Sequence, residues 1–213
     1  MSYSNSFPQQ RPTLNLDFAN SGKLDSRISY TRSSTGTFMS NEKHLSSENL
    51  LTYSNPNDSA WTELGTVVET DQTASPDGTS NASAVTEDSS TGVHRAILST
   101  PVNSGDDLTI VAYLKANGRS IVRLEQTGTY TTSCVVECEL SGSGTTTTRL
   151  GSPTNVSIAQ IGSTGWYKIS YSSTTTSSGT HYTQLRLCDA ADSTSYTGDG
   201  NSGVYAYGFN LSS

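Results

Sequence analysis

Residues 107–126 read DLTIVAYLKANGRSIVRLEQ, and this stretch decides the fold class of the chain. Apolar and polar residues alternate through DLTIVAYLKA and again through RSIVRLEQ, which is the pattern of half-buried strands. Asn117 and Gly118 lie between the two runs, and Asn-Gly favours the positive backbone φ angles that a type I′ turn requires. We therefore expect a β-hairpin over residues 107–126 in an all-β protein.

The same alternation continues along the chain. Turn residues such as those of Pro76–Gly78 separate further short strands at regular spacing, and no segment has a convincing helical pattern. Such spacing is typical of a sandwich or barrel with eight to ten strands. The expected strands are GTVVET, NASAVTE, VHRAIL, SCVVECEL, NVSIAQI, WYKISYSS, HYTQLRLCD and VYAYGFNL.

Strand phase assigns side chains to a core face and an outer face, because side chains alternate along a strand. The last strand is ambiguous: Tyr205, Tyr207, Phe209 and Leu211 share one face, which is either core or a closing edge. The predicted core is Leu108, Ile110, Ala112, Leu114, Val122, Leu124, Val136, Cys138, Leu140, Tyr167, Ile169, Tyr171, Leu185 and Leu187.

Composition excludes several classes of function. The 213 residues carry a net charge of −7 and no cluster of Lys or Arg, which argues against nucleic-acid binding. No run approaches the ~20 apolar residues of a membrane span. MSYSNSFPQQRP lacks the basic start and apolar segment of a signal peptide, so we expect a soluble protein made in a cytoplasm.

The three cysteines show no disulfide framework. Cys134 and Cys138 lie four residues apart in one predicted strand, about 13 Å between Cα atoms, which is too far to bridge. A bond from either one to Cys188 is possible but not indicated. We expect three small buried hydrophobic residues in a protein that folds in a reducing compartment.

Two segments are predicted. Residues 1–48 contain short β-like pieces with too few apolar residues for a core of their own, and we expect an extended arm that lies on another surface. Residues 49–213 carry the regular strands and form the main domain. The arm residues expected to anchor it are Leu14, Leu16, Phe18, Ile28 and Tyr30.

A glycan site is predicted on the outer strand faces, since sugars stack on aromatic rings while amides and charged groups bind their hydroxyls. The alternative is that Trp166 packs under a loop and the charges belong to a solvated face. The candidate glycan residues are Tyr113, Arg123, Trp166, Gln184 and Arg186.

Acidic turns suggest a calcium site at Asp77, Asp88 and Asp199, although Asp and Gly are also ordinary turn residues.

Catalysis has weaker support. Glu137 and Glu139 share a strand face about 6.6 Å apart, a spacing compatible with a glycosidase but common on solvated strands. The chain has no GxSxG motif, its histidines are scattered, and Cys138, Cys188 and His181 lack the spacing of a metal site. We expect a protein that is not an enzyme and needs no cofactor, with calcium as the one possible exception.

Several blocks resemble, in the same order, a recurring domain of tailed-phage structural proteins. They are ENLLTYSNPNDSAW, SPDGTSNASAVTE, LTIVAYLKANGRSIVRLE, GWYKISYS and YTGDGNSGVYAYGFNL, preceded by the arm segment PTLNLDFANSGKLDSRISYTRSSTGTF. That domain is similar to jelly-roll carbohydrate-binding modules and concanavalin-A-like sandwiches. Here only MSNEKHLSSE connects the arm to NLLTYS, and no coiled-coil or collagen-like shaft is present.

The resemblance implies an antiparallel jelly-roll β-sandwich with an N-terminal arm, in a virion assembled in the host cytoplasm. It implies a structural protein, either a capsid decoration or a tail or fibre component, that binds the major capsid or tail protein. The lack of a shaft favours decoration of a surface. Copies on a symmetric particle are expected to associate as homo-oligomers. The alternative is a carbohydrate-binding module or fibre tip that recognises host surface glycans.

Overall fold

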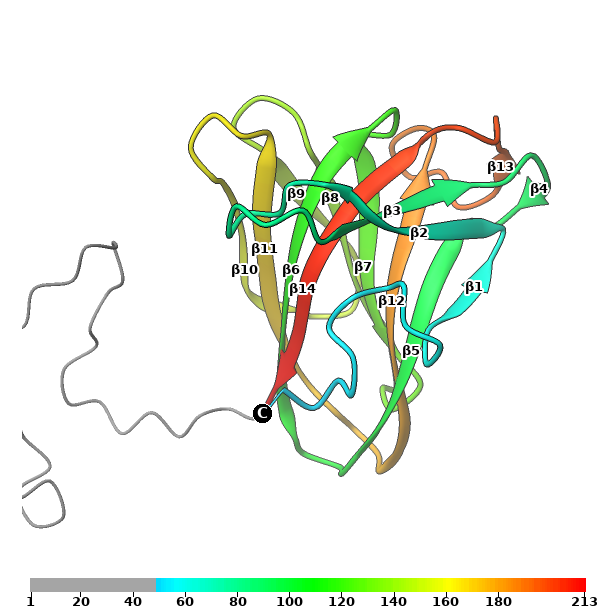
Figure 1. Ribbon diagram of the computed structural model, residues 1–213. Coiled ribbons are helices and arrows are strands. Elements are labelled where there is room, and N and C mark those ends of the chain that lie inside the picture. The colour runs from blue at the N-terminus through cyan, green and yellow to red at the C-terminus, as the bar shows by residue number, and fades with distance from the viewer. Residues whose placement is uncertain (1–48) are drawn as a thin grey trace, which may run out of the picture. The chain divides into compact units, whose positions relative to one another are not determined.

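The computed structural model describes residues 49–213, which form two antiparallel six-stranded sheets packed as a sandwich (Figure 1). The predicted all-β sandwich is therefore confirmed. The expected arm of residues 1–48 lies outside the described residues. In spatial order, sheet A contains β1 (Thr62–Leu64), β5 (Arg95–Val102), β12 (Gly179–Cys188), β7 (Ile121–Thr127), β8 (Cys134–Glu139) and β9 (Thr145–Leu150).

Sheet B is the second layer, and it faces the viewer in Figure 1. A small third sheet pairs β4 (Thr91–Gly92) with β13 (Tyr196–Thr197). Residues 49–213 contain no helix, and hence none long and apolar enough to cross a membrane. In spatial order, sheet B contains β10 (Thr154–Gln160), β11 (Trp166–Thr174), β6 (Asp107–Asn117), β14 (Gly203–Ser212), β3 (Ala82–Glu87) and β2 (Thr66–Thr73).

The core lies between the two sheets and matches the predicted set. Every residue assigned to it from strand phase is buried, from Leu108 on β6 to Leu187 on β12. Trp61 and Phe209 close the core in edge-to-face contact, with ring centroids 5.1 Å apart. Cys134, Cys138 and Cys188 are free and buried, as the sequence predicted. Burial raises the pKa of Cys138 and of Cys188 to about 12, so neither is a reactive thiolate.

The predicted hairpin over residues 107–126 is wrong. Its two strands exist, but β6 pairs with β11 and β14 in sheet B, whereas β7 pairs with β12 and β8 in sheet A. Residues 118–120 therefore cross from one sheet to the other. Gly118 keeps the expected positive φ of 90°, and the Arg119 amide bonds the Gly203 carbonyl rather than closing a hairpin. Both strands turn their apolar faces to the same core from opposite sides.

A bulge in β14 resolves the ambiguity of the last strand. Its pairing with β6 shifts between Tyr207 and Asn210, and Gly208 has a φ of 61°. The extra residue reverses the alternation, since bulges place two residues opposite one. Phe209 and Leu211 are consequently core, while Tyr205 and Tyr207 lie on the outer face.

Both edge strands of sheet B are also irregular. The pairing of β2 with β3 shifts between Glu69 and Thr73, and Asp71 there has a φ of 56°. The pairing of β10 with β11 shifts after Thr154, where Asn155 has a φ of 53°. On sheet A, the edge strand β1 is only three residues long.

Candidate functional site

The structure divides the predicted glycan residues between the two outer faces of the sandwich. Tyr113 on β6 and Trp166 on β11 belong to sheet B, whereas Arg123 on β7 and Gln184 and Arg186 on β12 belong to sheet A. Strand phase correctly separates outer residues from core residues, but it does not say which sheet a strand joins. The five residues therefore do not form one site.

Trp166 does not have the exposed ring that sugar stacking requires. Its side chain is buried at 2 % exposure, and its indole Nε1 donates a hydrogen bond to the Ala74 carbonyl at 3.0 Å. Tyr113 lies near Tyr207, with ring centroids 6.2 Å apart, and the Tyr207 hydroxyl donates to Asp77. The alternative that Trp166 packs under a covering segment is thus the correct one.

Three arginines lie side by side across the outer face of sheet A. Arg95 on β5 is opposite Arg186 on β12, and Arg186 is in turn opposite Arg123 on β7. Glu137 on β8 is opposite Arg123 and completes the row. Like charges directly opposite one another destabilise a sheet, so this row requires compensating carboxylates.

Arg186 is compensated by Glu125 of β7. Its Nη2 donates to Glu125 Oε2 at 3.0 Å, and its Nε lies 2.8 Å from Oε1 without the alignment of a hydrogen bond. Both side chains are largely buried, although they stand on the outer face of a sheet. A buried ion pair of this kind gives little net stability, because desolvation offsets the attraction between the charges.

Arg123 is compensated by Glu137 and by the loop that follows β12. Its Nε donates to Glu137 Oε2 at 3.0 Å, and its Nη2 donates to Asp192 Oδ1 at 2.6 Å. Arg149 of β9 donates to the other oxygen of Glu137, and the Asp192 amide also donates to Glu137 at 3.0 Å. The loop is thus fixed onto the sheet, with Asp192 at a φ of 61°.

These contacts argue against the predicted alternative of a catalytic carboxylate pair. Burial raises the pKa of Glu137, but the hydrogen bonds from Arg149, the Asp192 amide and Arg123 outweigh it and bring this pKa below its ordinary value. A carboxyl group held ionised in this way is a poor general acid. Glu139 accepts a hydrogen bond from the Ser120 hydroxyl at 2.8 Å.

A groove with a volume of about 370 Å³ opens beside this row; we call it the sheet A groove. Gln184 lies in its wall, where its Oε1 accepts from Arg95 at 2.9 Å and its Nε2 donates to Thr127 at 2.8 Å. The lining residues are Arg95, Arg123, Glu125, Thr127, Ser133, Val135, Leu150, Gln184, Arg186 and Thr194.

An exposed aromatic ring adjoins the groove. Tyr182 precedes Gln184 by two residues on β12, stands opposite Thr127 of β7, and is 39 % exposed. Its ring lies against Gly128, where an added Cβ would come within 2.8 Å of ring carbon Cδ2. The sequence prediction missed Tyr182, although it shares the strand phase of Gln184 and Arg186. It also missed Arg95, the first residue of β5.

The three predicted calcium ligands do not converge. Asp77 accepts hydrogen bonds from Ser75, Thr79 and Tyr207, Asp88 accepts from Ser90, and Asp199 accepts from Asn201 and Ser202. Side-chain hydrogen bonds hold the pKa of Asp77 and of Asp199 far below the ordinary value. Residues 49–213 contain no cluster of three or more His, Cys, Asp or Glu side chains suited to a metal.

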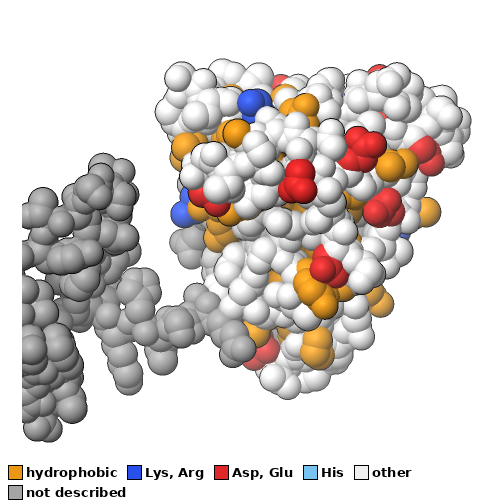
Figure 2. Space-filling model, in the orientation of Figure 1, with side chains coloured by type: hydrophobic (Ala, Val, Ile, Leu, Met, Phe, Trp, Pro, Cys, Tyr) orange, Lys and Arg blue, Asp and Glu red, His pale blue; other side chains and the backbone are white. Residues whose placement is uncertain are grey.

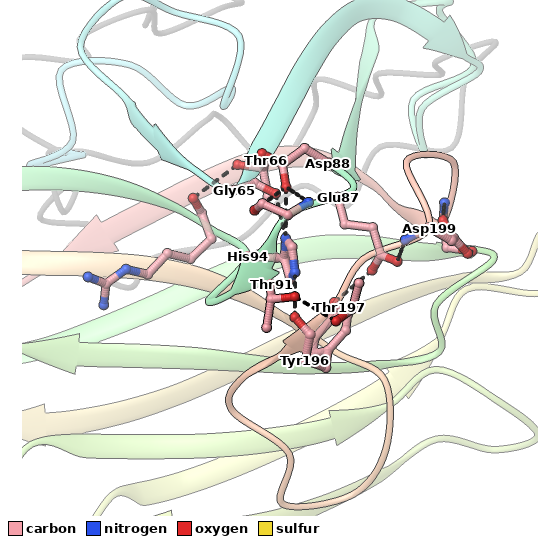
Figure 3. A network of polar contacts seen from close by, with 12 residues as sticks. Gly65, Thr66, Glu87, Asp88, Thr91, His94, Tyr196, Thr197 and Asp199 are labelled. Carbon is pink, nitrogen blue, oxygen red and sulfur yellow. Dashed lines mark hydrogen bonds and ion pairs between the residues drawn. The ribbon is translucent and has the colours of Figure 1, made fainter.

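A second polar network ties the small β4–β13 sheet to sheet B (Figure 3). The buried imidazole of His94 contacts the Gly65 carbonyl at 2.6 Å and the Tyr196 carbonyl at 3.3 Å. Glu87 accepts hydrogen bonds from the Tyr196 hydroxyl, the Asp199 amide and Arg119. Burial raises the pKa of Glu87, but these hydrogen bonds outweigh it and lower the value.

A hollow of about 570 Å³ lies next to this network, on the outer face of sheet B. Its lining includes Glu69, Asn117, Asn201 and Tyr205. Figure 2 shows the molecule in the orientation of Figure 1, with Asp and Glu side chains scattered over the face in view and few Lys or Arg. The sheet A groove is the stronger candidate, because three of the predicted polar residues line it and the exposed Tyr182 stands on the same face of β12, two residues from Gln184.

Comparison with protein-family models and with curated proteins found no match for this chain. Its function must therefore be inferred from the groove and from the sequence motifs.

Proposed function

We propose that this chain is a non-enzymatic surface protein of a tailed-phage virion, and that its sandwich binds glycans through the sheet A groove. The observation that carries the proposal is the alignment of Tyr182, Gln184 and Arg186 along one outer face of β12, where Tyr182 is exposed and the other two line the groove. An exposed ring offers a stacking surface for the C–H face of a sugar. The neighbouring amide and guanidinium groups offer hydrogen bonds to its hydroxyls.

The rigidity of the groove supports binding. Its polar side chains are held in place by one another, through the Arg186–Glu125 pair and the chain of contacts from Arg95 through Gln184 to Thr127. A site whose donors are already oriented loses less entropy when a ligand binds. Buried charges on the outer face of a sheet contribute little to stability, so a binding role gives them a physical reason to be there.

The virion part of the proposal rests on the sequence motifs. The ordered blocks between Glu48 and Leu211 resemble a domain of tailed-phage structural proteins, and the segment of residues 12–38 resembles the piece that precedes it. Of the possible locations on the virion we favour the capsid surface, where the chain would be a decoration protein anchored by residues 1–48.

Glycan binding is tested with Tyr182→Ala and a matched control, Tyr113→Ala, which removes a tyrosine from the outer face of sheet B. Binding to a panel of immobilised bacterial surface polysaccharides is measured for both variants and for the unchanged protein. We expect Tyr182→Ala to weaken binding about fivefold, since stacking on one ring is worth roughly 1 kcal/mol. Loss with Tyr113→Ala alone would place the site on sheet B instead.

Location is tested by mass spectrometry of purified source particles. Hundreds of copies per particle, counted against the major shell protein, are expected for a capsid decoration protein. A few to a few dozen copies would indicate a tail or fibre component. If the protein is missing from the particles, the virion proposal is wrong and a free binding module remains.

A further inference from the structure

Within residues 49–213, the arginine row along the groove contains one charge without an ion-pair partner. Arg123 and Arg149 contact Glu137, and Arg186 contacts Glu125. Arg95 makes no ion pair with any of residues 49–213. Its single side-chain hydrogen bond to a described residue goes from Nη1 to the neutral amide oxygen of Gln184.

The surroundings of Arg95 make this unpaired charge unfavourable. It stands at the end of the arginine row, directly opposite Arg186. Burial lowers the pKa of Arg95 and the neighbouring charge of Arg186 lowers it further, while the charge of Glu125 opposes this only in part. The Arg95 Nε is buried and makes no hydrogen bond to residues 49–213. A bound anion that contacts the terminal nitrogens of Arg95 would relieve the repulsion between the two arginines.

Resting on the proposed function, we infer that the glycan bound in the sheet A groove carries a carboxylate, as in a uronic acid, and that Arg95 recognises it. A planar guanidinium is well suited to a carboxylate, because its N–H groups match the two oxygens. Arg95 is more suitable than the other arginines of the row, whose donors already contact Glu125, Glu137 or Asp192.

The positive charge of Arg95 contrasts with the negative net charge of the chain. The chain carries a net charge of −7, which repels acidic polymers at long range. Capture of an acidic glycan therefore requires a local positive group inside a groove, where water and salt screen it less. Tyr182 lies on the same strand face as Gln184, which contacts Arg95. Its ring would stack on the sugar that carries the carboxylate or on the adjoining sugar.

The test compares acidic polysaccharides with their own uncharged forms. Polygalacturonate, alginate and hyaluronan are each used intact and after chemical reduction of the carboxyl groups, together with neutral dextran and mannan. Affinity is measured for the unchanged protein, for Arg95→Gln, and for the control Lys168→Gln. The control removes the same charge from the exposed outer face of sheet B.

We expect at least one acidic polymer to bind about tenfold more tightly than its reduced form, as for one charged hydrogen-bonded pair. Arg95→Gln should abolish that preference, and Lys168→Gln should keep it. Equal binding of acidic and reduced polymers, or a preference that survives in Arg95→Gln, would overturn the role of Arg95 while leaving glycan binding intact. If the unchanged protein binds none of the acidic or neutral polymers, both the inference and the proposed glycan binding fail.

Discussion

A buried histidine makes the stability of this protein sensitive to mild acid. His181 on β12 points into the sandwich on the same face as Leu185 and Leu187, and its side chain has no exposed surface. Its ring lies 5.7 Å from that of Tyr130, and the hydroxyls of Thr129 and Thr183 lie 3.5 and 3.4 Å from its nitrogens. Among residues 49–213 it has no carboxylate partner.

Burial lowers the pKa of His181 from 6.5 to about 4. In the unfolded chain this imidazole binds a proton as the pH falls through 6.5, while in the folded protein it stays neutral until about pH 4. The unfolded state therefore binds more protons in this interval, and stability falls as the pH decreases. Between pH 7.5 and 5 the loss amounts to about 2 kcal/mol, at 1.36 kcal/mol for each pH unit below 6.5.

The measurement is urea unfolding of the unchanged protein and of His181→Gln at several values between pH 7.5 and 5. Groups that titrate in both proteins cancel in the difference, and the carboxylates with lowered pKa do not titrate in this range. We expect the unchanged protein to lose about 2 kcal/mol more than the variant. The absolute stability of the variant does not matter, because only the change with pH is compared. Parallel curves for the two proteins would refute a buried neutral His181.

Three further predictions concern stability and are measured by urea unfolding. Glu137→Gln removes the carboxylate shared by two arginines and should cost about 3 kcal/mol, whereas Glu139→Gln on the same strand face should cost less than about 1. Trp166→Ala should cost roughly 3–5 kcal/mol because the ring is buried, and an unaffected protein would contradict that burial. Gly198→Ala should destabilise the β4–β13 region, since its added Cβ would overlap the Asp88 carbonyl.

Much of the fold could be predicted because strand phase depends on local sequence alone. Each alternating run buries its apolar residues whichever sheet it joins, so the core set from Leu108 to Leu187 was correct. The prediction of a hairpin at Asn117 and Gly118 was wrong because the positive φ of Gly118 suits a connection between two sheets as well as a hairpin turn. The two possibilities differ only in long-range pairing, which a single sequence does not display.

The site was less predictable for the same reason. The strands that carry Tyr113 and Trp166 show the same alternation of apolar and polar residues as the strands that carry Arg123 and Gln184. The two pairs nevertheless belong to different sheets, so their outer residues face opposite sides of the sandwich. Trp166 is covered by the segment around Ala74, which is distant from it in the sequence. In β14, Gly208 was the one visible sign of the bulge that moves Tyr207 outward.

The irregular strands at the borders of sheet B have a consequence for crowded assemblies. An open strand border presents unpaired N–H and C=O groups that can join the sheet of another molecule and lead to aggregation. The backbone shifts near Asp71 and Asn155 break the regular spacing of those groups on both borders. Where many copies are held close together, contacts across these two borders would rely on side chains instead of a continuous sheet.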